Sequence, residues 1–336
     1  MRLLMMGTGP FAVPTFQRLV NSIHCVLALV TRPAPVGKGT PPPNPMRLAA
    51  ESLGVPVYDP ASINGEESRL LIQELSPDLF VVCDYGQILQ PAILQLAPLG
   101  GINLHGSLLP KFRGAAPIQR AILAGETVTG ISVIHMSPVL DAGPILATRM
   151  TPIGAHETAP ELESRLSPLG VEAVMESIEM LAAHQGAQPA ASPDMPASPA
   201  AVAPLGSPQD PSLVSRAPRL QKSEGLVDWT RSAVEIDRQV RALKPWPTTY
   251  SFWERPGQNP VRLILERVAP VAPVAPAAGE SVAPGVIASV ASNQVLVGTG
   301  QGLLALHAVQ PAGKRAMEIS EFVRGYPMQP GQRFGT

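Results

Sequence analysis

The chain has 336 residues, of which 45% are hydrophobic and only 15% charged. This length is too great for one ordinary domain and suits two, each with its own core. The 39 proline residues exclude a chain built only of helices and central strands, because proline breaks both. No stretch reaches the roughly 18 apolar residues of a membrane span, and the apolar run at the N-terminus is too short for a signal peptide. We therefore expect a cytoplasmic protein.

The net charge of −1 hides an uneven distribution along the chain. Residues 1–212 hold 11 Lys and Arg against 17 Asp and Glu, a net charge of −6, whereas residues 213–336 hold 14 against 9, a net charge of +5. A basic C-terminal part suits a polyanion as partner. Chance scatter over a solvated surface explains the asymmetry about equally well.

The two cysteines, Cys25 and Cys83, each lie in an apolar run, and we expect both to be buried small hydrophobic residues. Two isolated cysteines form neither a disulfide framework nor a metal site.

The first hundred residues alternate between strand and helix patterns. Short apolar runs predict strands at Leu3–Met6, Val26–Val30, Leu79–Cys83 and Gly101–Leu104. Helix patterns lie between them at Pro14–Leu19, Met46–Leu53 and Glu66–Leu75. This alternation predicts a parallel sheet with helices on both faces and a ligand site beyond the carboxyl ends of the strands. Gly7-Thr8-Gly9 lacks the third glycine of a nucleotide loop, so we interpret it as a tight strand-to-helix turn.

Composition divides the chain into two domains. Apolar residues recur at helical spacing over Glu157–Leu181 and predict a helix that closes a first domain, residues 1–186. Seven of the 26 residues in Ala187–Ser212 are proline, which predicts an extended linker at 187–212. The second domain then covers residues 213–336.

The second domain opens with a predicted helix at Ala233–Leu243 and continues with short strand patterns separated by glycine turns. Two of these strands, Val261–Val268 and Val286–Val297, flank a low-complexity patch at Ala269–Pro284 that we interpret as a loop extension. The pattern fits a small barrel of the oligonucleotide-binding type, which would suit the basic charge, and fits a sandwich equally well.

The segment GINLHGSLLPKFRG, residues 101–114, is the most informative for chemistry. Asn103, His105 and Ser107 occupy every second position, so an extended chain would point all three to one face. An asparagine amide can donate to a developing oxyanion, and histidine exchanges protons near neutral pH. A lone histidine is more often a hydrogen-bonded structural residue, and the neighbouring Asn103 favours the functional interpretation here.

A second segment, GISVIHMSPVLDAGPIL at 130–146, combines a predicted strand at Ile131–Met136 with a loop that carries Asp141. A single Asp in a glycine-containing loop is usually a turn former. A carboxylate beside a histidine can also fix its tautomer and raise its basicity. The sequence does not reveal whether Asp141 approaches His105.

Together these segments resemble the methionyl-tRNA formyltransferases. The resemblance rests on NLHGSLLPKFRGAAPIQ and LDAG, and it extends over nearly the whole chain through GTGPFAVP, VVCDYGQIL, RALKPWPTTY and QPAGKRAM. It implies a Rossmann-like formyltransferase domain followed by an OB-like barrel that helps to hold tRNA. It also implies a monomeric cytoplasmic enzyme that needs no metal and takes its formyl group from 10-formyltetrahydrofolate. The acceptor would be the α-amino group of methionine on initiator tRNA, for translation initiation.

The resemblance also assigns residues. It implies a catalytic trio of Asn103, His105 and Asp141, and a folate-binding signature of Ser107, Leu108, Leu109 and Pro110. Basic side chains of the second domain would contact phosphates: Lys222, Arg238, Arg241, Lys314 and Arg315.

Three segments depart from the family pattern. Thr31–Pro45 is short and carries only Arg32 and Lys38, although the equivalent family loop is usually basic. Ser137-Pro138-Val139 precedes LDAG where an acidic residue and a glycine are expected, and the proline-rich linker resembles an insertion. Other acceptors, an amino-sugar nucleotide or a ribonucleotide amine, remain alternatives, as does a non-catalytic RNA-binding protein on the same scaffold.

Overall fold

The computed structural model describes residues 1–34, 44–187, 205–271 and 282–335. Much of the predicted linker 187–212, of the loop Thr31–Pro45 and of the patch Ala269–Pro284 lies outside the described residues. The chain forms two compact units. Unit 1 comprises Met1–Pro117, Val128–Pro152 and Leu162–Pro218, and unit 2 comprises Ile118–Thr127, Ile153–Glu161 and Arg219–Thr336.

Unit 1 is built on a seven-stranded sheet with the order β3-β2-β1-β4-β5-β7-β8. Its strands are β1 (Arg2–Gly7), β2 (Cys25–Val30), β3 (Val57–Tyr58), β4 (Leu79–Cys83), β5 (Gly101–His105), β7 (Val128–His135) and β8 (Ile145–Pro152). The first five pair in parallel, which confirms the predicted parallel sheet. Strands β7 and β8 extend the sheet in antiparallel pairing, a feature that the sequence pattern did not indicate.

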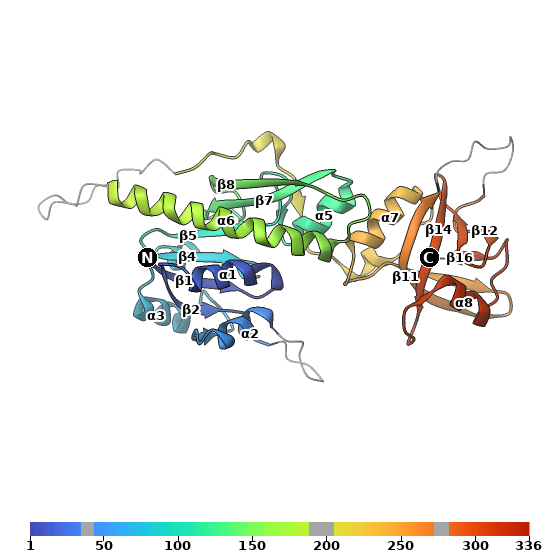
Figure 1. The fold of residues 1–336 in the computed structure, drawn as a ribbon, viewed down its shortest axis with the longest axis horizontal. Helices are drawn as coiled ribbons and strands as arrows, with labels where there is room; N and C mark the ends of the chain where they lie inside the picture. Colours follow the sequence, from blue (N-terminus) through green and yellow to red (C-terminus); the bar gives the residue numbers. More distant parts are fainter. Residues whose placement is uncertain (35–43, 188–204, 272–281, 336) are drawn as a thin grey trace, which may run out of the picture. The chain divides into compact units, whose positions relative to one another are not determined.

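Helices cover both faces of this sheet, as predicted (Figure 1). The main ones are α1 (Val13–Val20), α2 (Pro45–Ser52), α3 (Glu66–Leu75), the short α4 (Pro91–Leu94) and α6 (Ala159–Ala187). On one face, Leu4 and Phe80 pack with Ile72 of α3. On the other, Gly170 of α6 lies so close to β5 that a Cβ there would come within 2.5 Å of the Leu104 side chain.

The two cysteines differ in environment. Cys83 is buried at the end of β4, as predicted, and burial raises the pKa of its thiol well above the usual value. Cys25 is exposed at the start of β2, so the prediction that it is buried is wrong.

Unit 2 contains α7 (Ala233–Ala242) and an antiparallel sheet with the order β12-β13-β14-β11-β10-β16, to which β15 is added beside β14. The strands are β10 (Tyr250–Arg255), β11 (Gln258–Val271), β12 (Ile287–Val290), β13 (Val295–Gly298), β14 (Leu303–Pro311), β15 (Met317–Glu318) and β16 (Arg333–Gly335), and α8 (Ile319–Gly325) follows β15. The predicted single strand Val286–Val297 is therefore two strands, joined by a turn in which Ala291 N donates to Gln294 O over 2.9 Å.

Backbone hydrogen bonds close this sheet into a barrel. Phe334 N donates to Gly285 O over 2.7 Å, and Ile287 N donates to Gln332 O over 2.8 Å, so the last strand joins the segment that leads into β12. This closure identifies the fold of unit 2 as a barrel and not a sandwich, two alternatives that the sequence pattern fitted equally well.

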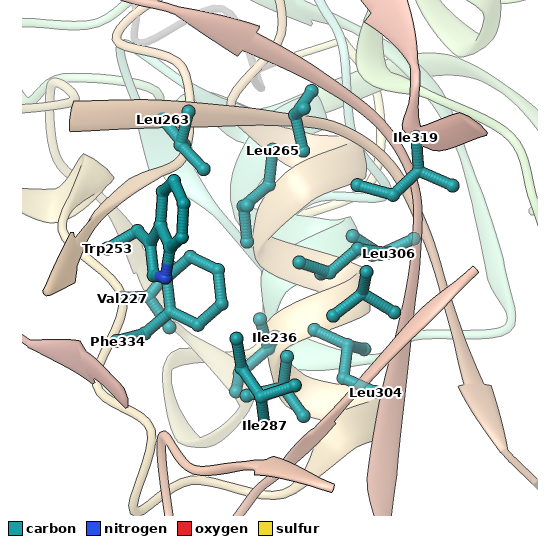
Figure 2. Packing of buried hydrophobic residues seen from close by; sticks show 14 of the residues in the cluster. Val227, Ile236, Trp253, Leu263, Leu265, Ile287, Leu304, Leu306, Ile319 and Phe334 are labelled. Carbon is teal, nitrogen blue, oxygen red and sulfur yellow. The ribbon is translucent and has the colours of Figure 1, made fainter. Parts of the chain in front are cut away.

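The barrel interior is one hydrophobic core, to which α7 contributes Ile236 (Figure 2). The α7 helix begins with a capping box, in which the Ser232 hydroxyl accepts from Glu235 N and the Glu235 carboxylate accepts from Ser232 N. The hydrogen bonds that the Glu235 carboxylate accepts from Ser232 N, Ser232 Oγ and Arg231 lower its pKa to about 2.

Within the described ranges, no helix combines the length and the apolar character that crossing a membrane requires.

Candidate active site

Strand β5 carries the first two residues of the predicted trio. Asn103 and His105 lie on the same face of β5, and His105 is only 5% exposed. His105 Nε2 lies 2.9 Å from Phe112 O, and a carbonyl oxygen can only accept, so this nitrogen carries a hydrogen. The interaction fixes the ring orientation and leaves Nδ1 facing the interior of the site.

Asp141 reaches this face from the opposite end of β5. Because β7 runs antiparallel to β5, with Ile102 beside His135, the loop after β7 starts near the beginning of β5. The loop must fold back over the sheet, and Asp141 adopts a left-handed φ of 51°. Gly143 permits the reversal, since a Cβ there would lie 1.7 Å from His135 O.

The Asp141 carboxylate lies at the centre of the trio. Its Oδ1 accepts from Asn103 Nδ2 over 3.3 Å, and its Oδ2 accepts from Gly114 N over 2.9 Å. The same Oδ2 lies 3.8 Å from His105 Nδ1, and both side chains are largely shielded from solvent. The structure thus brings together the three side chains whose proximity the sequence did not reveal.

Ser107 lies beyond the end of β5. Strand β5 ends at His105, so the predicted alternation stops before Ser107, which is fully buried in the following loop. Its hydroxyl donates to Lys111 O over 2.7 Å, and its carbonyl accepts from Ser132 Oγ. These bonds hold the loop that follows the strand.

The remaining members of the predicted folate signature differ in exposure. Leu109 is 7% exposed, and its N–H donates to Ser132 Oγ over 3.0 Å. Leu108 and Pro110 are half-buried, and the peptide bond between Leu109 and Pro110 is cis. Leu108 and Pro110 are therefore the two residues of this segment with apolar surface to offer a ligand.

Gln209 is a member of the site that sequence reasoning missed. Its Nε2 donates to Asp141 O and to Gly143 O, both over 2.8 Å, and its Oε1 accepts from Arg113 Nη2 over 2.7 Å. One side chain thus joins the Asp141 loop to the loop after β5. Gln209 lies in the proline-rich stretch, where composition gave no signal of a structural role.

The segment around Gln209 also supports the loop that contacts His105. Strands β6 (Arg113–Gly114) and β9 (Arg216–Ala217) pair in parallel, and a Cβ on Gly114 would lie 2.4 Å from Ala217 O. Phe112 N donates to Ser215 Oγ over 2.9 Å. The last part of unit 1 therefore fixes the carbonyl that holds the His105 ring.

Two family models match the chain. The model described as formyl transferase matches residues 1–178, and the model described as formyl transferase, C-terminal domain, matches residues 219–327. The chain belongs to the formyl transferase family. The first match includes Asn103, His105 and Asp141, whereas Gln209 lies between the two matches.

Curated relatives resemble this formyl transferase over their full length. A methionyl-tRNA formyltransferase of Rhodopirellula baltica is 44% identical over 99% of this chain and 96% of its own. Proteins of the same name from Geobacter sulfurreducens and Thermus thermophilus are 38% and 39% identical, over 100% of this chain and 97% and 99% of theirs.

Solved structures share the fold. An N-formyltransferase from Helicobacter canadensis, in complex with folinic acid and dTDP-3-aminofucose, gives a TM-score of 0.62 at 14% identity, over 92% of this chain and 98% of its own. HypX from Aquifex aeolicus, in complex with tetrahydrofolic acid, gives a TM-score of 0.57 at 16% identity, over 100% of this chain and 51% of its own.

Two further carboxyl groups of the formyl transferase, Asp84 and Glu163, interact with each other, and Asp84 lies beside the Gly7–Gly9 turn. Asp84 follows β4 with a left-handed φ of 48°, and a Cβ on Gly9 would lie 1.8 Å from its Oδ2. Gly9 is therefore required by a carboxylate of the protein itself, which supports interpreting the segment as a turn and not as a phosphate loop. Asp84 retains contact with solvent, although protein atoms surround most of its carboxylate.

Lost hydration raises the pKa values of this pair. It raises the pKa of Asp84 to about 6, against the opposing effects of Gly9 N–H and Arg32. It raises the pKa of Glu163, on α6, to about 7, and the negative charge of Asp84 adds to the increase. Both pKa values therefore lie close to neutral pH, because the folded environment hydrates the ionised form of each carboxyl less well than water does.

We expect Glu163→Gln to stabilise the protein at pH 8 but not at pH 5. A carboxyl whose pKa is raised in the folded state destabilises it progressively as pH rises from the unfolded value toward about 7. After allowance for solvent screening, removing the charge should raise the free energy of unfolding by about 1 kcal/mol at pH 8. Urea denaturation at both pH values measures the change. Glu172→Gln, at an exposed position of the same helix, is the control. Equal effects at both pH values would contradict the assignment.

We expect Gln209→Ala to lower kcat for formyl transfer about ten- to a hundredfold, because the Asp141 loop loses two hydrogen bonds that position its carboxylate. The matched control is Gln310→Ala, which removes a glutamine that donates to Lys314 O in unit 2. Steady-state kinetics measure both variants, and a wild-type kcat for Gln209→Ala would refute the positioning role.

Proposed function

We propose that this protein transfers the formyl group of 10-formyltetrahydrofolate to the α-amino group of methionine on initiator methionyl-tRNA, in the cytoplasm, for translation initiation. The observation that carries the proposal is the Asp141 carboxylate, which hydrogen-bonds Asn103 and faces the His105 ring. The full-length relatives named methionyl-tRNA formyltransferase support the choice of acceptor.

The proposed chemistry follows from the donors and acceptors in the site. The amine attacks the formyl carbon, a new C–N bond forms, and the bond from that carbon to the folate nitrogen breaks. Asn103 donates an N–H to the oxygen on which negative charge develops. His105 Nε2 faces Phe112 O and Nδ1 faces the Asp141 carboxylate, and both of these partners accept N–H groups. A His105 ring protonated on both nitrogens would therefore be held in place, and its positive charge would stabilise the same oxygen. A proton moves from the amine to the departing nitrogen, with Asp141 orienting His105.

The residues present fit a folate donor. A folate carries a pterin ring whose faces can pack against apolar side chains while its edge bears hydrogen-bonding groups. Apolar side chains lie next to the carboxylate in the chain: Val139 is 64% exposed and Leu140 54% exposed. With the half-buried Leu108 and Pro110, they offer apolar surface to such a ring. Ser107 and Leu109 are enclosed and would contribute by holding the loop. Within the described residues, no cluster of three or more His, Cys, Asp or Glu side chains is arranged to hold a metal ion.

The basic second domain supports an RNA acceptor, although its basic residues are not equivalent. Lys222 and Lys314 are exposed and suited to phosphate contacts. Arg241 instead donates to Asp237 over 2.8 Å and to Glu157 O over 3.0 Å. The Arg315 guanidinium pairs with Glu321. We therefore propose that the lysines contribute more to RNA binding than these two arginines.

We expect Asp141→Asn and Asn103→Ala each to lower kcat about 10²–10³-fold, because the first removes the charge beside His105 and the second an oxyanion donor. Single-turnover measurements with saturating substrates separate this loss from weaker binding. Asp210→Asn, at an exposed carboxylate of the same unit, is the control. Near wild-type rates in both site variants would remove the trio from the mechanism.

The acceptor is tested directly with formyl-labelled 10-formyltetrahydrofolate. We expect label on methionyl initiator tRNA, little on methionyl elongator tRNA, and none on an amino-sugar nucleotide. KM for the tRNA should rise steeply between 50 and 200 mM salt, by an order of magnitude or more, because phosphate contacts release counterions. Labelling of the sugar nucleotide alone, with no dependence on salt, would establish the alternative acceptor and contradict the proposal.

A further inference from the structure

The three tryptophans of the chain lie in unit 2 and differ sharply in exposure. Trp229 and Trp253 are 3% and 2% exposed, and their indole N–H groups donate to Ser251 and Gln332. Trp246 is 55% exposed, and among the described residues its indole has no hydrogen-bond partner. Single exposed apolar side chains are common on protein surfaces, so the exposure of Trp246 indicates a binding site only if its surroundings also suit a ligand.

Trp246 lies in a connection that is fixed at both ends. Between α7 and β10, Thr248 N donates to Leu243 O over 2.9 Å, and Leu265 N donates to Thr249 O over 2.8 Å. Lys244 Nζ lies 3.5 Å from Glu266 on β11. The backbone around Trp246 is therefore held to α7 and to β11, and the ring is presented to solvent from a structured turn.

The same connection leads into an aromatic and basic face of the barrel. Ser251 and Trp253 are buried on the inner side of β10, so Tyr250 and Phe252 lie on its outer side, with their rings 5.9 Å apart. Phe252 pairs with Arg262 of β11, and the Arg262 guanidinium lies 4.0 Å from the centroid of the Tyr250 ring.

The Arg262 charge is not neutralised by a neighbour. No carboxylate in the described part of the chain lies within ion-pairing distance of it, whereas Arg267, farther along β11, pairs with Glu318 over 2.5 Å. The Tyr250 ring holds the planar guanidinium by a cation–π contact. A guanidinium held in this way can stack on a nucleobase and still attract a phosphate.

Tyr250 connects Trp246, through the chain, to Arg262, through the ring contact. Tyr250 follows Trp246 by four positions in the chain, so their Cα atoms are at most about 14 Å apart, and the Tyr250 ring contacts the Arg262 guanidinium. Residues 213–336 hold a net charge of +5, which suits a polyanion better than an acidic or neutral protein surface. Exposed bases stack on aromatic rings and on guanidinium planes, whereas bases inside a duplex are already stacked.

We propose that Trp246 and Arg262 form a stacking platform for an unpaired stretch of the tRNA substrate, a base lying on the indole ring and the adjoining backbone or base on the guanidinium. The inference rests on the proposed function, since it names the part of unit 2 that binds the RNA. It goes beyond contacts to phosphates, because stacking distinguishes single-stranded from paired nucleotides.

Tryptophan fluorescence tests the platform directly, because Trp246 is the one exposed tryptophan of the three in the sequence. We expect uncharged initiator tRNA and a short single-stranded RNA to quench the solvent-exposed part of the emission, and a duplex of the same sequence to leave it nearly unchanged. Trp246→Phe should abolish the quenching and still fold, as thermal unfolding checks. Binding of tRNA in a filter assay without any change in Trp246 emission would overturn the proposal. So would equal quenching by the duplex, or concentration-dependent self-association that quenches without RNA.

Kinetics test the contribution to the reaction. We expect Trp246→Ala and Arg262→Ala to raise KM for methionyl-tRNA about tenfold, with kcat and KM for the folate donor unchanged. Arg267→Ala removes an arginine from the same strand and should change KM less than twofold. A wild-type protein that formylates no methionyl-tRNA contradicts the proposed function. A wild-type protein that does so, with unchanged KM in both platform variants, contradicts the platform alone.

Discussion

The candidate active site depends on one carboxylate and on the loop that brings it to β5. Asp141 accepts hydrogen bonds from Asn103 and Gly114 and faces His105, so it joins a strand and two loops with one functional group. A buried carboxylate without such donors would be costly, because it would exchange hydration for an apolar environment. The hydrogen bonds from Asn103 and Gly114 stabilise the buried Asp141 carboxylate, and they also orient the side chains that would act on a formyl carbon.

The loops around this carboxylate are held by a segment distant in sequence. Gln209 bonds the Asp141 loop, and Ser215 bonds the loop that contacts His105. Gln209 lies near the end of the proline-rich stretch and Ser215 lies just after it, and their contacts show why a chain segment poor in regular structure can still matter for the site. Positioning of this kind needs directed hydrogen bonds rather than a hydrophobic core.

The two groups of carboxyls in unit 1 have opposite environments. Asp141 accepts hydrogen bonds from Asn103 and Gly114, whereas partial desolvation raises the pKa values of Asp84 and Glu163 toward neutrality. Unit 2 shows a third arrangement, where the Arg262 guanidinium lies over the Tyr250 ring and pairs with no carboxylate of the described residues. Each arrangement follows from which partners surround the charged group rather than from the type of residue.

The sequence by itself determined the elements and the chemistry available. Short apolar runs predicted the parallel strands, because such strands are buried on both faces. Helical patterns predicted α3 and α7 close to their observed bounds, because burial of one helix face imposes that period. The motif around Asn103 and His105 indicated the family, which the family models confirm. The sequence contained the short strands of the second domain, but it did not determine that they close into a barrel, because a sandwich would bury the same alternating residues.

Only the tertiary structure decided which of these residues meet. The antiparallel direction of β7, the return of its loop across β5 and the position of Gln209 depend on long-range pairing, which no local periodicity encodes. The same holds for Ser107, where the strand ends too early for the alternation to continue, and for Cys25, which is left uncovered at the start of β2. The spacing of residues along one helix or strand shows which side chains that element can bury. A functional site depends instead on side chains that several elements bring together.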